Sequence, residues 1–330
     1  MLSTIVDMIG GFIAVLLGGW LFVNAMEHIS YRYRLGGSFV GAVISPILTS
    51  LPELIVFLVA LLAYGGAAGE DVAVGTVIGE PFVVSTLIYP VIFLVAIIGF
   101  YVGLRNDLVL EVGRELVLPF TVVAALFPTV LLPALLGVGV VRYVIAAALF
   151  TAYIIYVRLM RSKEGVVVED VEELLLLRLV GPNAEVALML QVVISVVLLY
   201  VGSRYLVSGV IDLSTALAID VMGLSMVIIP TATVLPESIT AIIWTLRNRD
   251  TMAVAALIGE KVLYSTIYPA LALLLTRWSL TYEAVIGVVT VEVVSIAMLY
   301  HVIRARLTWD VGLIGLAGYV IYILVLTSAH

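Results

Sequence analysis

The chain has 330 residues, of which 63% are hydrophobic and only 12% are charged, and its formal net charge is −7. Soluble domains carry roughly 25% charged residues, so a soluble fold could not bury this much apolar surface. Apolar runs of about 20 residues recur along the whole chain, and each is long enough to cross a bilayer as a helix. A membrane barrel would instead show short alternating segments. The composition therefore predicts an all-α membrane protein.

Several classes of function are unlikely on composition alone. The absence of cysteine excludes disulfides and thiolate metal sites, and the three histidines (His28, His301 and His330) lack the spacing of metal ligands. No nucleophile–base arrangement is present, so we expect neither an enzyme nor a resident cofactor, and no nucleic-acid partner. The lack of cysteine and the scarcity of Asn and Gln are typical of thermophilic proteins.

Ten membrane spans are predicted from the apolar runs. They cover approximately residues 4–26, 36–64, 72–103, 115–136, 140–160, 185–209, 213–246, 251–276, 280–302 and 309–328. The longest hydrophilic stretch, 161–183, contains an acidic run and predicts a short amphipathic linker helix. It divides the chain into two five-span units, 1–160 and 184–330.

Orientation follows from the distribution of Lys and Arg over the expected loops. One side collects twelve of them, whereas the other collects only Arg142, Arg204 and Arg277. Because basic loops stay in the cytoplasm, we expect both termini outside the cell membrane and the 161–183 loop inside. The expected partners are the lipid bilayer and inorganic cations. The sequence does not specify an oligomeric state, and a monomer is compatible with it.

The sequence contains two copies of the pattern Pro-x-x-Thr-x-Leu-Pro-Glu. Residues 46–53 match residues 230–237 at five of eight positions, and residues 71–86 match residues 251–266 at seven of sixteen. The span of the first copy runs outward and that of the second runs inward, which predicts inverted repeats with a substrate site at the midplane between them. The core motifs of the two repeats cover residues 36–103 and 213–276.

Two prolines interrupt each copy of the pattern, Pro46 and Pro52 in the first and Pro230 and Pro236 in the second. A proline inside a helix removes a backbone donor and clashes with the preceding turn. We therefore expect spans two and seven to be broken helices. Carbonyl groups freed in this way are tolerated within a membrane only where they face protein or a wet cavity.

The central carboxylates are Glu53 and Glu237, which lie near the middle of these spans. A carboxylate at the midplane costs about 2.5 kcal/mol or more, so each needs a partner. The hydroxyls of Thr49 and Thr233 and the freed carbonyls are hard oxygen ligands. This set suits Ca²⁺, which prefers 6–8 oxygens, and Na⁺ would accept a subset. The alternative is that each glutamate is only a structural hydrogen-bond partner.

A second pair of carboxylates, Glu80 and Glu260, follows glycines that permit close helix approach, Gly79 and Gly259. Four neighbouring carboxylates would not all be ionised, so some are protonated, or neutralised by cations or by Lys261. This is the chemistry that a proton-coupled or cation-coupled antiporter needs. Alternatively, Lys261 only locks a helix contact. Further polar groups one to two turns along are Ser85 and Ser265.

These motifs resemble the cation/calcium exchanger superfamily, and most closely its sodium/calcium exchanger branch. Residues 49–53 (TSLPE) are similar to the first signature of that branch, Gly-Thr-Ser-Leu-Pro-Glu, and residues 233–237 (TVLPE) are similar to its repeat. The resemblance implies two inverted five-span repeats, with both termini outside. It further implies that Glu53 and Glu237 are central calcium ligands. The residues that it implies for the calcium or sodium sites are Thr49, Ser50 and Thr233.

The second signature of the branch, Gly-Ser-Asn, reads Gly-Glu-Pro at 79–81 and Gly-Glu-Lys at 259–261. Several sodium-site oxygens of the family are therefore absent. We expect a secondary-active antiporter that moves a divalent cation, Ca²⁺, against Na⁺ or H⁺ by alternating access, with H⁺ favoured by this departure. The alternatives are a transporter of another metal or solute, and a non-transporting exchanger whose Lys261 ammonium contacts both Glu53 and Glu237.

Overall fold

The computed structural model describes residues 2–32, 45–137, 139–161, 173–177 and 183–328. The α-helices are α1 (Leu2–Arg32), α2 (Ser45–Thr49), α3 (Leu51–Val59), α4 (Gly66–Val83), α5 (Tyr89–Tyr101), α6 (Val117–Leu126), α7 (Leu132–Leu136), α8 (Gly139–Arg161), α10 (Ala184–Leu217), α11 (Val221–Leu246), α12 (Asp250–Tyr264), α13 (Ile267–Leu275), α14 (Tyr282–Ile303) and α15 (Asp310–Ser328). The π-turns are η2 (Ala60–Tyr64) and η3 (Val84–Ile88), and the 3₁₀ turns are η4 (Arg114–Leu116) and η5 (Phe127–Leu131). Two short antiparallel strands pair, β1 (Leu110–Glu111) and β2 (Arg306–Leu307).

Within the described ranges, nine helices are long and apolar enough to cross a membrane. A shorter apolar helix, Leu51–Tyr64, corresponds to the second half of the predicted second span. The prediction of an all-α, multi-pass membrane protein is confirmed. The first part of that second span, 36–44, and most of the predicted linker helix at 161–183 lie outside the described residues.

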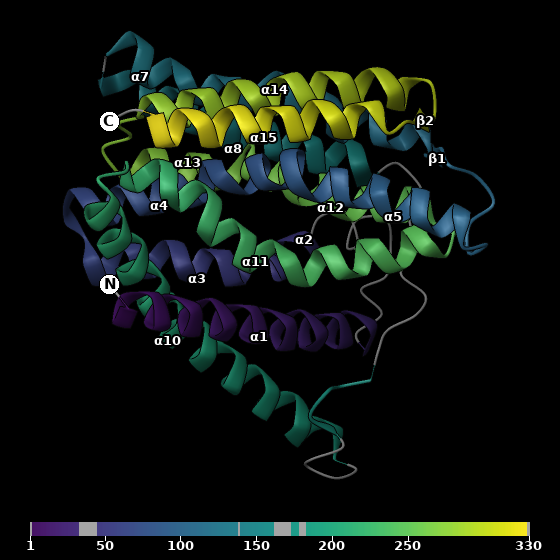
Figure 1. Ribbon diagram of the computed structural model, residues 1–330, viewed down its shortest axis with the longest axis horizontal. Helices are drawn as coiled ribbons and strands as arrows, with labels where there is room; N and C mark the ends of the chain where they lie inside the picture. Colours follow the sequence, from purple (N-terminus) through teal and green to yellow (C-terminus); the bar gives the residue numbers. More distant parts are fainter. Residues whose placement is uncertain (1, 33–44, 138, 162–172, 178–182, 329–330) are drawn as a thin grey trace.

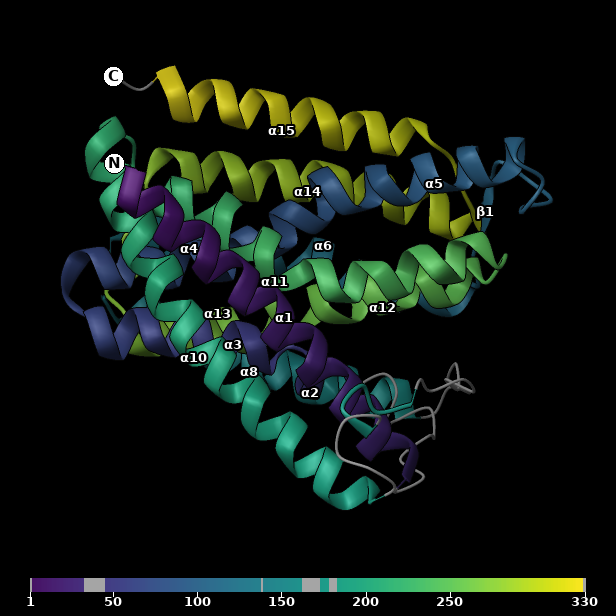
Figure 2. The same cartoon turned by 60° about the horizontal axis from the view of Figure 1, so that its bottom comes forward.

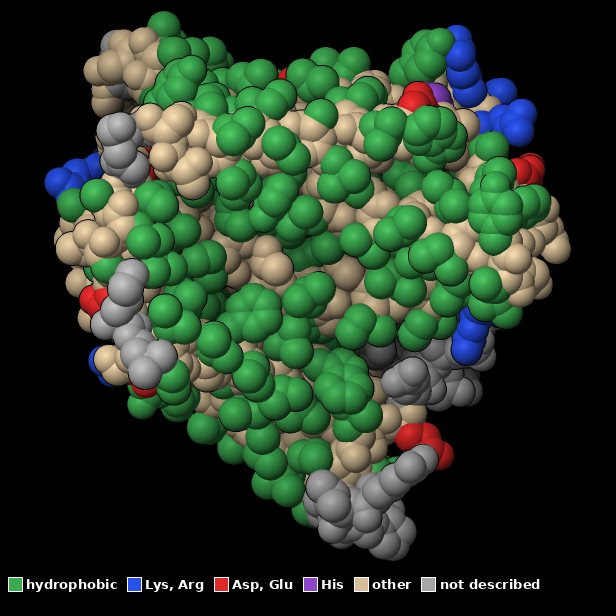
Figure 3. Space-filling model, viewed as in Figure 1, with side chains coloured by type: hydrophobic (Ala, Val, Ile, Leu, Met, Phe, Trp, Pro, Cys, Tyr) green, Lys and Arg blue, Asp and Glu red, His purple; other side chains and the backbone are tan. Residues whose placement is uncertain are grey.

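The helices form a bundle with a distinct interior. Helices α1 and α10 lie along one flank and α14 and α15 along the opposite one, with α4, α11 and α12 between them (Figures 1 and 2). The two ends of the chain lie at the same end of the bundle, and the β1–β2 pair lies at the other (Figure 1). Lys and Arg side chains gather toward the two ends, separated by a broad hydrophobic band (Figure 3). This is the surface expected of a bundle that spans a bilayer.

Helices α1 and α10 pack in close contact through glycines. A Cβ atom added to Gly11 would lie 2.7 Å from Leu206 N and 2.8 Å from Gly202 O. A Cβ atom added to Gly202 would in turn lie 2.8 Å from the Cβ of Ala14. Small residues allow such contacts between transmembrane helices, where van der Waals packing replaces the hydrophobic effect as the driving force.

Buried polar side chains connect this helix pair to the described part of the linker. Gln191 Nε2 donates to Asn24 Oδ1 at 2.8 Å and to Leu21 O at 2.9 Å. Asn24 Oδ1 also accepts from Leu175 N at 3.2 Å, and Gln191 Oε1 accepts from Leu176 N at 3.1 Å. Because buried backbone groups must be satisfied internally, these two amides supply partners for the backbone N–H groups of Leu175 and Leu176.

A buried ion pair fixes the end of the bundle that carries the strands. The Arg105 guanidinium donates to both carboxylate oxygens of Asp250, at 2.6 and 2.9 Å, and to the carbonyl of Thr245. Asp250 also accepts from Glu111 N at 3.0 Å, in strand β1. Bidentate pairs of this kind are geometrically specific. The pair therefore ties the chain after α5 to the start of α12.

The structure corrects the prediction that span seven is broken. Helix α11 is continuous from Val221 to Leu246, with Pro230 and Pro236 inside it. Pro230 lacks the N–H that would bond to the Met226 carbonyl, but α4 packs directly against this carbonyl at Gly79, and the Thr231 hydroxyl donates to the next carbonyl, Val227 O, at 2.6 Å. Prolines are tolerated in membrane helices where hydroxyls and neighbouring helices compensate for the missing hydrogen bonds.

In span two, the helix is interrupted at a single residue. Helix α2 ends at Thr49 and α3 begins at Leu51, with Ser50 in a turn. Backbone hydrogen bonds continue across it, from Ser50 N to Pro46 O at 3.0 Å and from Leu54 N to Ser50 O at 3.3 Å. The described part of this span is therefore locally distorted and not unwound.

The larger irregularities lie in spans three and eight, at matching points of the two sequence repeats. Residues 85–90 read STLIYP, whereas residues 265–269 read STIYP and are one residue shorter. The longer copy forms the π-turn η3, closed by a hydrogen bond from Tyr89 N to Val84 O. The shorter copy makes tight turns, with Ser265 N bonded to Val262 O at 3.2 Å. A π-turn holds one more residue than an α-turn, which accounts for the difference.

Replacing Gly11 by alanine is predicted to destabilise the bundle, because the new methyl group overlaps the backbone of α10. The matched control is Gly10→Ala on the same helix, since a Cβ atom there meets nothing within 4 Å. Thermal unfolding of both variants in detergent should show a lower Tm for Gly11→Ala. The Tm of Gly10→Ala should be unchanged or higher, because alanine is favoured over glycine in helices by about 1 kcal/mol. Equal Tm values would contradict the packing described here.

Candidate cation site

Four buried carboxyl groups come from four different helices: Glu53 from α3, Glu80 from α4, Glu237 from α11 and Glu260 from α12. None is more than 8% exposed. A side-chain hydrogen bond joins the carboxyl groups of Glu237 and Glu260, and Glu260 Oε1 accepts from the Thr49 hydroxyl at 3.3 Å. The Glu53 carboxyl faces the Thr233 hydroxyl. Carboxyl and hydroxyl groups from both sequence repeats therefore meet in one place.

Several polar atoms at this centre are buried and have no hydrogen-bond partner among the described residues. They are Glu53 Oε2, both carboxyl oxygens of Glu80, Tyr264 Oη and Ser265 Oγ. Buried polar atoms are nearly always paired in folded proteins, so a group of unpaired ones indicates places for water or ions. Their oxygens are hard ligands, of the kind that Ca²⁺ and Na⁺ accept.

The carboxyl groups do not form a closed metal cage in this conformation. No group of three Asp, Glu, His or Cys side chains among the described residues is arranged to hold a metal ion. The contact between Glu237 and Glu260 explains part of this, because each carboxyl group occupies the ligand position of the other. A cation bound here would have to separate them, and would draw further oxygens from hydroxyl and carbonyl groups.

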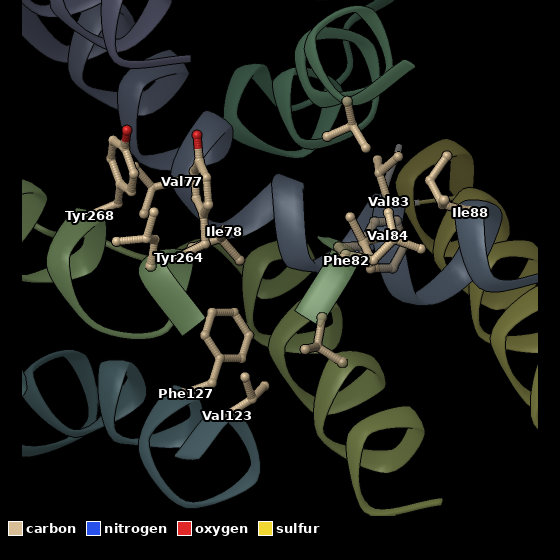
Figure 4. Close-up of a cluster of buried hydrophobic side chains, with 14 of the residues drawn as sticks. Val77, Ile78, Phe82, Val83, Val84, Ile88, Val123, Phe127, Tyr264 and Tyr268 are labelled. Carbon is tan, nitrogen blue, oxygen red and sulfur yellow. The ribbon is translucent and has the colours of Figure 1, made fainter. Parts of the chain in front are cut away.

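The backbone carbonyl at the Ser50 distortion is not available to an ion. Tyr268 Oη donates to Ser50 O at 2.7 Å and lies 2.8 Å from Ser50 Oγ. The rings of Tyr264 and Tyr268 stack at 4.3 Å, with their hydroxyls pointing the same way (Figure 4). Ser50, predicted as a ligand, thus binds a tyrosine of the other repeat. The sequence reasoning missed Tyr268, although the shared Ile-Tyr-Pro of the two repeats could have indicated it.

Close packing of α4 on α11 fixes the backbone position of Glu80. A Cβ atom added to Gly79 would lie 2.3 Å from Met226 O. The matching glycine of the second repeat, Gly259, is less tightly packed, since a Cβ atom there would lie 3.4 Å from Pro46 Cγ. The expected close approach therefore holds for Gly79, whereas α12 packs on α2 at an ordinary distance. Apolar side chains of α4 complete the interior around Tyr264 and Tyr268 (Figure 4).

Lys261 lies apart from the contact between Glu237 and Glu260. Its Nζ donates to Ser85 Oγ at 2.9 Å and to Ser295 Oγ at 3.1 Å, and it is 0% exposed. Within the described part of the chain, no carboxylate oxygen lies within 4.0 Å of the ammonium, so it does not bridge Glu53 and Glu237. The structure therefore brings Ser85 to Lys261, while Ser265 has no partner.

A fifth carboxyl group inside a membrane span was missed by the sequence reasoning. Glu292 lies on α14, is partly buried, and has one oxygen, Oε2, without a partner. Lys261 is its principal charged neighbour. The signal was present in the sequence, since the predicted span 280–302 contains two carboxylates, Glu283 near its start and Glu292 near its middle, and charged residues well inside a span are usually functional.

The fold and the site together define a multi-pass membrane protein with a cluster of carboxyl groups at its centre. The sodium/calcium exchanger protein family matches residues 3–161 and 187–328, and the chain belongs to this family. Membership of this family confirms the resemblance that the two signature motifs indicated. A search of curated proteins found no significant match.

Two solved exchangers share the fold. The H⁺/Ca²⁺ exchanger CAX is 17% identical with a TM-score of 0.75, over 98% of this chain and 81% of that one. The sodium–calcium exchanger NCX_Mj, soaked with 2.5 mM Na⁺ and 10 mM Sr²⁺, is 20% identical with a TM-score of 0.59, over 98% of each chain. At these identities the likeness concerns the fold alone.

Removing the Tyr268 hydroxyl is predicted to lower stability, because Tyr268→Phe removes the 2.7 Å hydrogen bond to the Ser50 carbonyl, which then keeps only the longer bond from Leu54 N. The net loss of one hydrogen bond costs about 0.5–1.5 kcal/mol. Tyr264→Phe is the matched control, since this hydroxyl on the stacked ring has no partner to lose. Thermal unfolding in detergent should separate the two. The assignment fails if Tyr264→Phe is the more destabilised variant.

Proposed function

We propose that the protein is a secondary-active antiporter that moves a divalent cation, Ca²⁺, across the cell membrane in exchange for H⁺ or Na⁺. The observation that carries the proposal is the meeting of Glu53, Glu237 and Glu260 at the buried centre of the bundle. Membership of the sodium/calcium exchanger protein family supports it, as do the names of the two exchangers that share the fold.

In this proposal Glu53 and Glu237 are the principal cation ligands. Two ionised carboxylates balance the charge of one divalent ion, which removes most of the cost of holding either within the membrane. The hydroxyls of Thr49 and Thr233 already face this carboxyl set and complete the oxygen shell. Glu80 and Glu260 supply further oxygens.

The counter-ion that the geometry favours is H⁺. Two ionised carboxylates repel at hydrogen-bonding distance, so the contact between Glu237 and Glu260 requires a shared proton. A Ca²⁺ ion that takes both oxygens must displace that proton. Protons and Ca²⁺ then exclude one another at the same groups, which is the condition for exchange.

Alternating access is the mechanism that this arrangement supports. The two sequence repeats would be related by inverted topology, with the site between them. Both ends of the chain lie at one end of the bundle, and the excess of Lys and Arg over the opposite loops favours the cytoplasm for that other end. The termini would then be extracellular.

Of the two alternatives, no observation favours a different metal or solute. The non-transporting exchanger would need the Lys261 ammonium against both Glu53 and Glu237. The ammonium instead donates to Ser85 and Ser295, and leaves the two central carboxyl groups free to bind a cation. The site therefore favours transport.

Neutralising either central ligand is predicted to abolish Ca²⁺ uptake by proteoliposomes. Glu53→Gln and Glu237→Gln each remove a ligand charge, and a loss of more than about 1.4 kcal/mol in binding reduces affinity at least tenfold. Glu70→Gln is the control, because Glu70 pairs at the surface with Arg277. Uptake by both central variants at the level of the unmodified protein would contradict the proposal.

The direction of coupling is predicted to follow the pH gradient. Vesicles loaded at low pH and diluted into Ca²⁺ at higher pH should take up Ca²⁺ while their lumen becomes more alkaline, as a trapped pH-sensitive dye would report. An outward Na⁺ gradient at constant pH should drive little uptake. If only the Na⁺ gradient drives uptake, the role of the shared proton is wrong.

A further inference from the structure

The Lys261 ammonium is held by oxygen atoms in the way that a bound cation would be. Two hydroxyls accept its hydrogen bonds, Ser85 Oγ at 2.9 Å and Ser295 Oγ at 3.1 Å. These hydroxyls come from η3 and α14, whereas Lys261 comes from α12. The ring of Tyr89 lies 5.6 Å from Nζ and presents its negative face to the charge.

Two carboxyl groups complete the surroundings, and neither reaches the ammonium directly. Glu80 and Glu292 are the acidic groups that act on Lys261, both beyond 4.0 Å. Both oxygens of Glu80 and Oε2 of Glu292 have no hydrogen-bond partner. The ammonium thus has two hydroxyl oxygens and an aromatic ring as its close neighbours, with two carboxyl groups further away.

The charge is present in only one of the two sequence repeats. In the match between residues 71–86 and 251–266, Lys261 corresponds to Pro81, and Ser85 corresponds to Ser265. Ser265 has no partner, whereas Ser85 accepts from Lys261. The second repeat therefore places a fixed positive charge on a hydroxyl of the first repeat, whereas the matching hydroxyl, Ser265 Oγ, has no partner among the described residues.

We propose that Lys261 is a tethered cation that permanently occupies a monovalent-cation subsite lined by Ser85, Ser295, Glu80 and Glu292. A hydroxyl and carboxylate lining is suited to a small cation such as Na⁺ as well as to an ammonium group. Because the lysine cannot leave, the subsite takes no mobile ion, and the neighbouring Ca²⁺ site works without Na⁺. The inference rests on the proposed function in that this subsite adjoins the exchange site.

The proposal predicts how the protein responds when the tethered charge is removed. Lys261→Ala leaves the two serine hydroxyls, the two carboxyl groups and the space that the lysine side chain filled. A mobile monovalent cation should then bind there and restore the charge balance. The variant should therefore depend on Na⁺, although the unmodified protein does not.

The test compares unmodified protein, Lys261→Ala and the triple variant Lys261→Ala/Ser85→Ala/Ser295→Ala, purified in NaCl or in choline chloride at equal ionic strength. Recovery of folded protein and Tm are measured for each. We expect Lys261→Ala to be recovered better in NaCl, with a Tm about 2–4 °C higher than in choline chloride. The unmodified protein should be indifferent to the salt, and the triple variant should lose most of the Na⁺ response.

Every outcome of this comparison is informative. Equal behaviour of Lys261→Ala in the two salts, whether folded or aggregated, overturns the inference, and so does an equal Na⁺ response of the triple variant. The unfolding measurement does not involve transport. A Na⁺-dependent variant without any Ca²⁺ uptake by the unmodified protein would refute the proposed function alone, whereas uptake without a Na⁺-dependent variant would refute the tethered cation alone.

Discussion

The cost of burying carboxyl groups within the membrane governs the arrangement of this protein. Each of the four central glutamates needs a proton, a cation or hydrogen-bond donors to remain there. Glu237 and Glu260 meet this need through each other, and Glu53 faces the Thr233 hydroxyl. For Glu80, the cation that acts on it is the Lys261 ammonium, which lies beyond 4.0 Å. Exchange of one neutralising partner for another at these groups is the simplest form of the proposed transport.

The helices make this cluster possible by close packing of backbones. Gly79 brings α4 onto the Met226 carbonyl of α11, which fixes the backbone next to Glu80. The distortions that follow Glu80 and Glu260 place Tyr89 beside Lys261 and Tyr268 against Ser50. Backbone irregularity in spans three and eight thus supports the site through side chains and does not itself supply the ligands.

The sequence predicted the membrane-spanning helices, and it identified the four buried glutamates as rare charges inside them, because hydropathy and intramembrane charges are local signals. Their role as cation ligands stays a prediction. Prediction from the sequence failed where the packing between helices determines the structure. Pro230 and Pro236 predicted a break, but α11 is continuous, with α4 packed against the Met226 carbonyl and the Thr231 hydroxyl bonded to Val227 O. The partner of Lys261 could not be predicted either, since Ser85 and Ser295 approach it only through the fold. Glu292 was visible in the sequence, but only its proximity to Lys261 gives it a role.

The central claim is that Ca²⁺ and a proton compete for the Glu237–Glu260 pair. The most direct measurement is the number of protons released when Ca²⁺ is added to the purified protein in weakly buffered detergent solution. The account predicts proton release that saturates together with Ca²⁺ binding and is lost in Glu237→Gln. Saturable Ca²⁺ binding without proton release would contradict it.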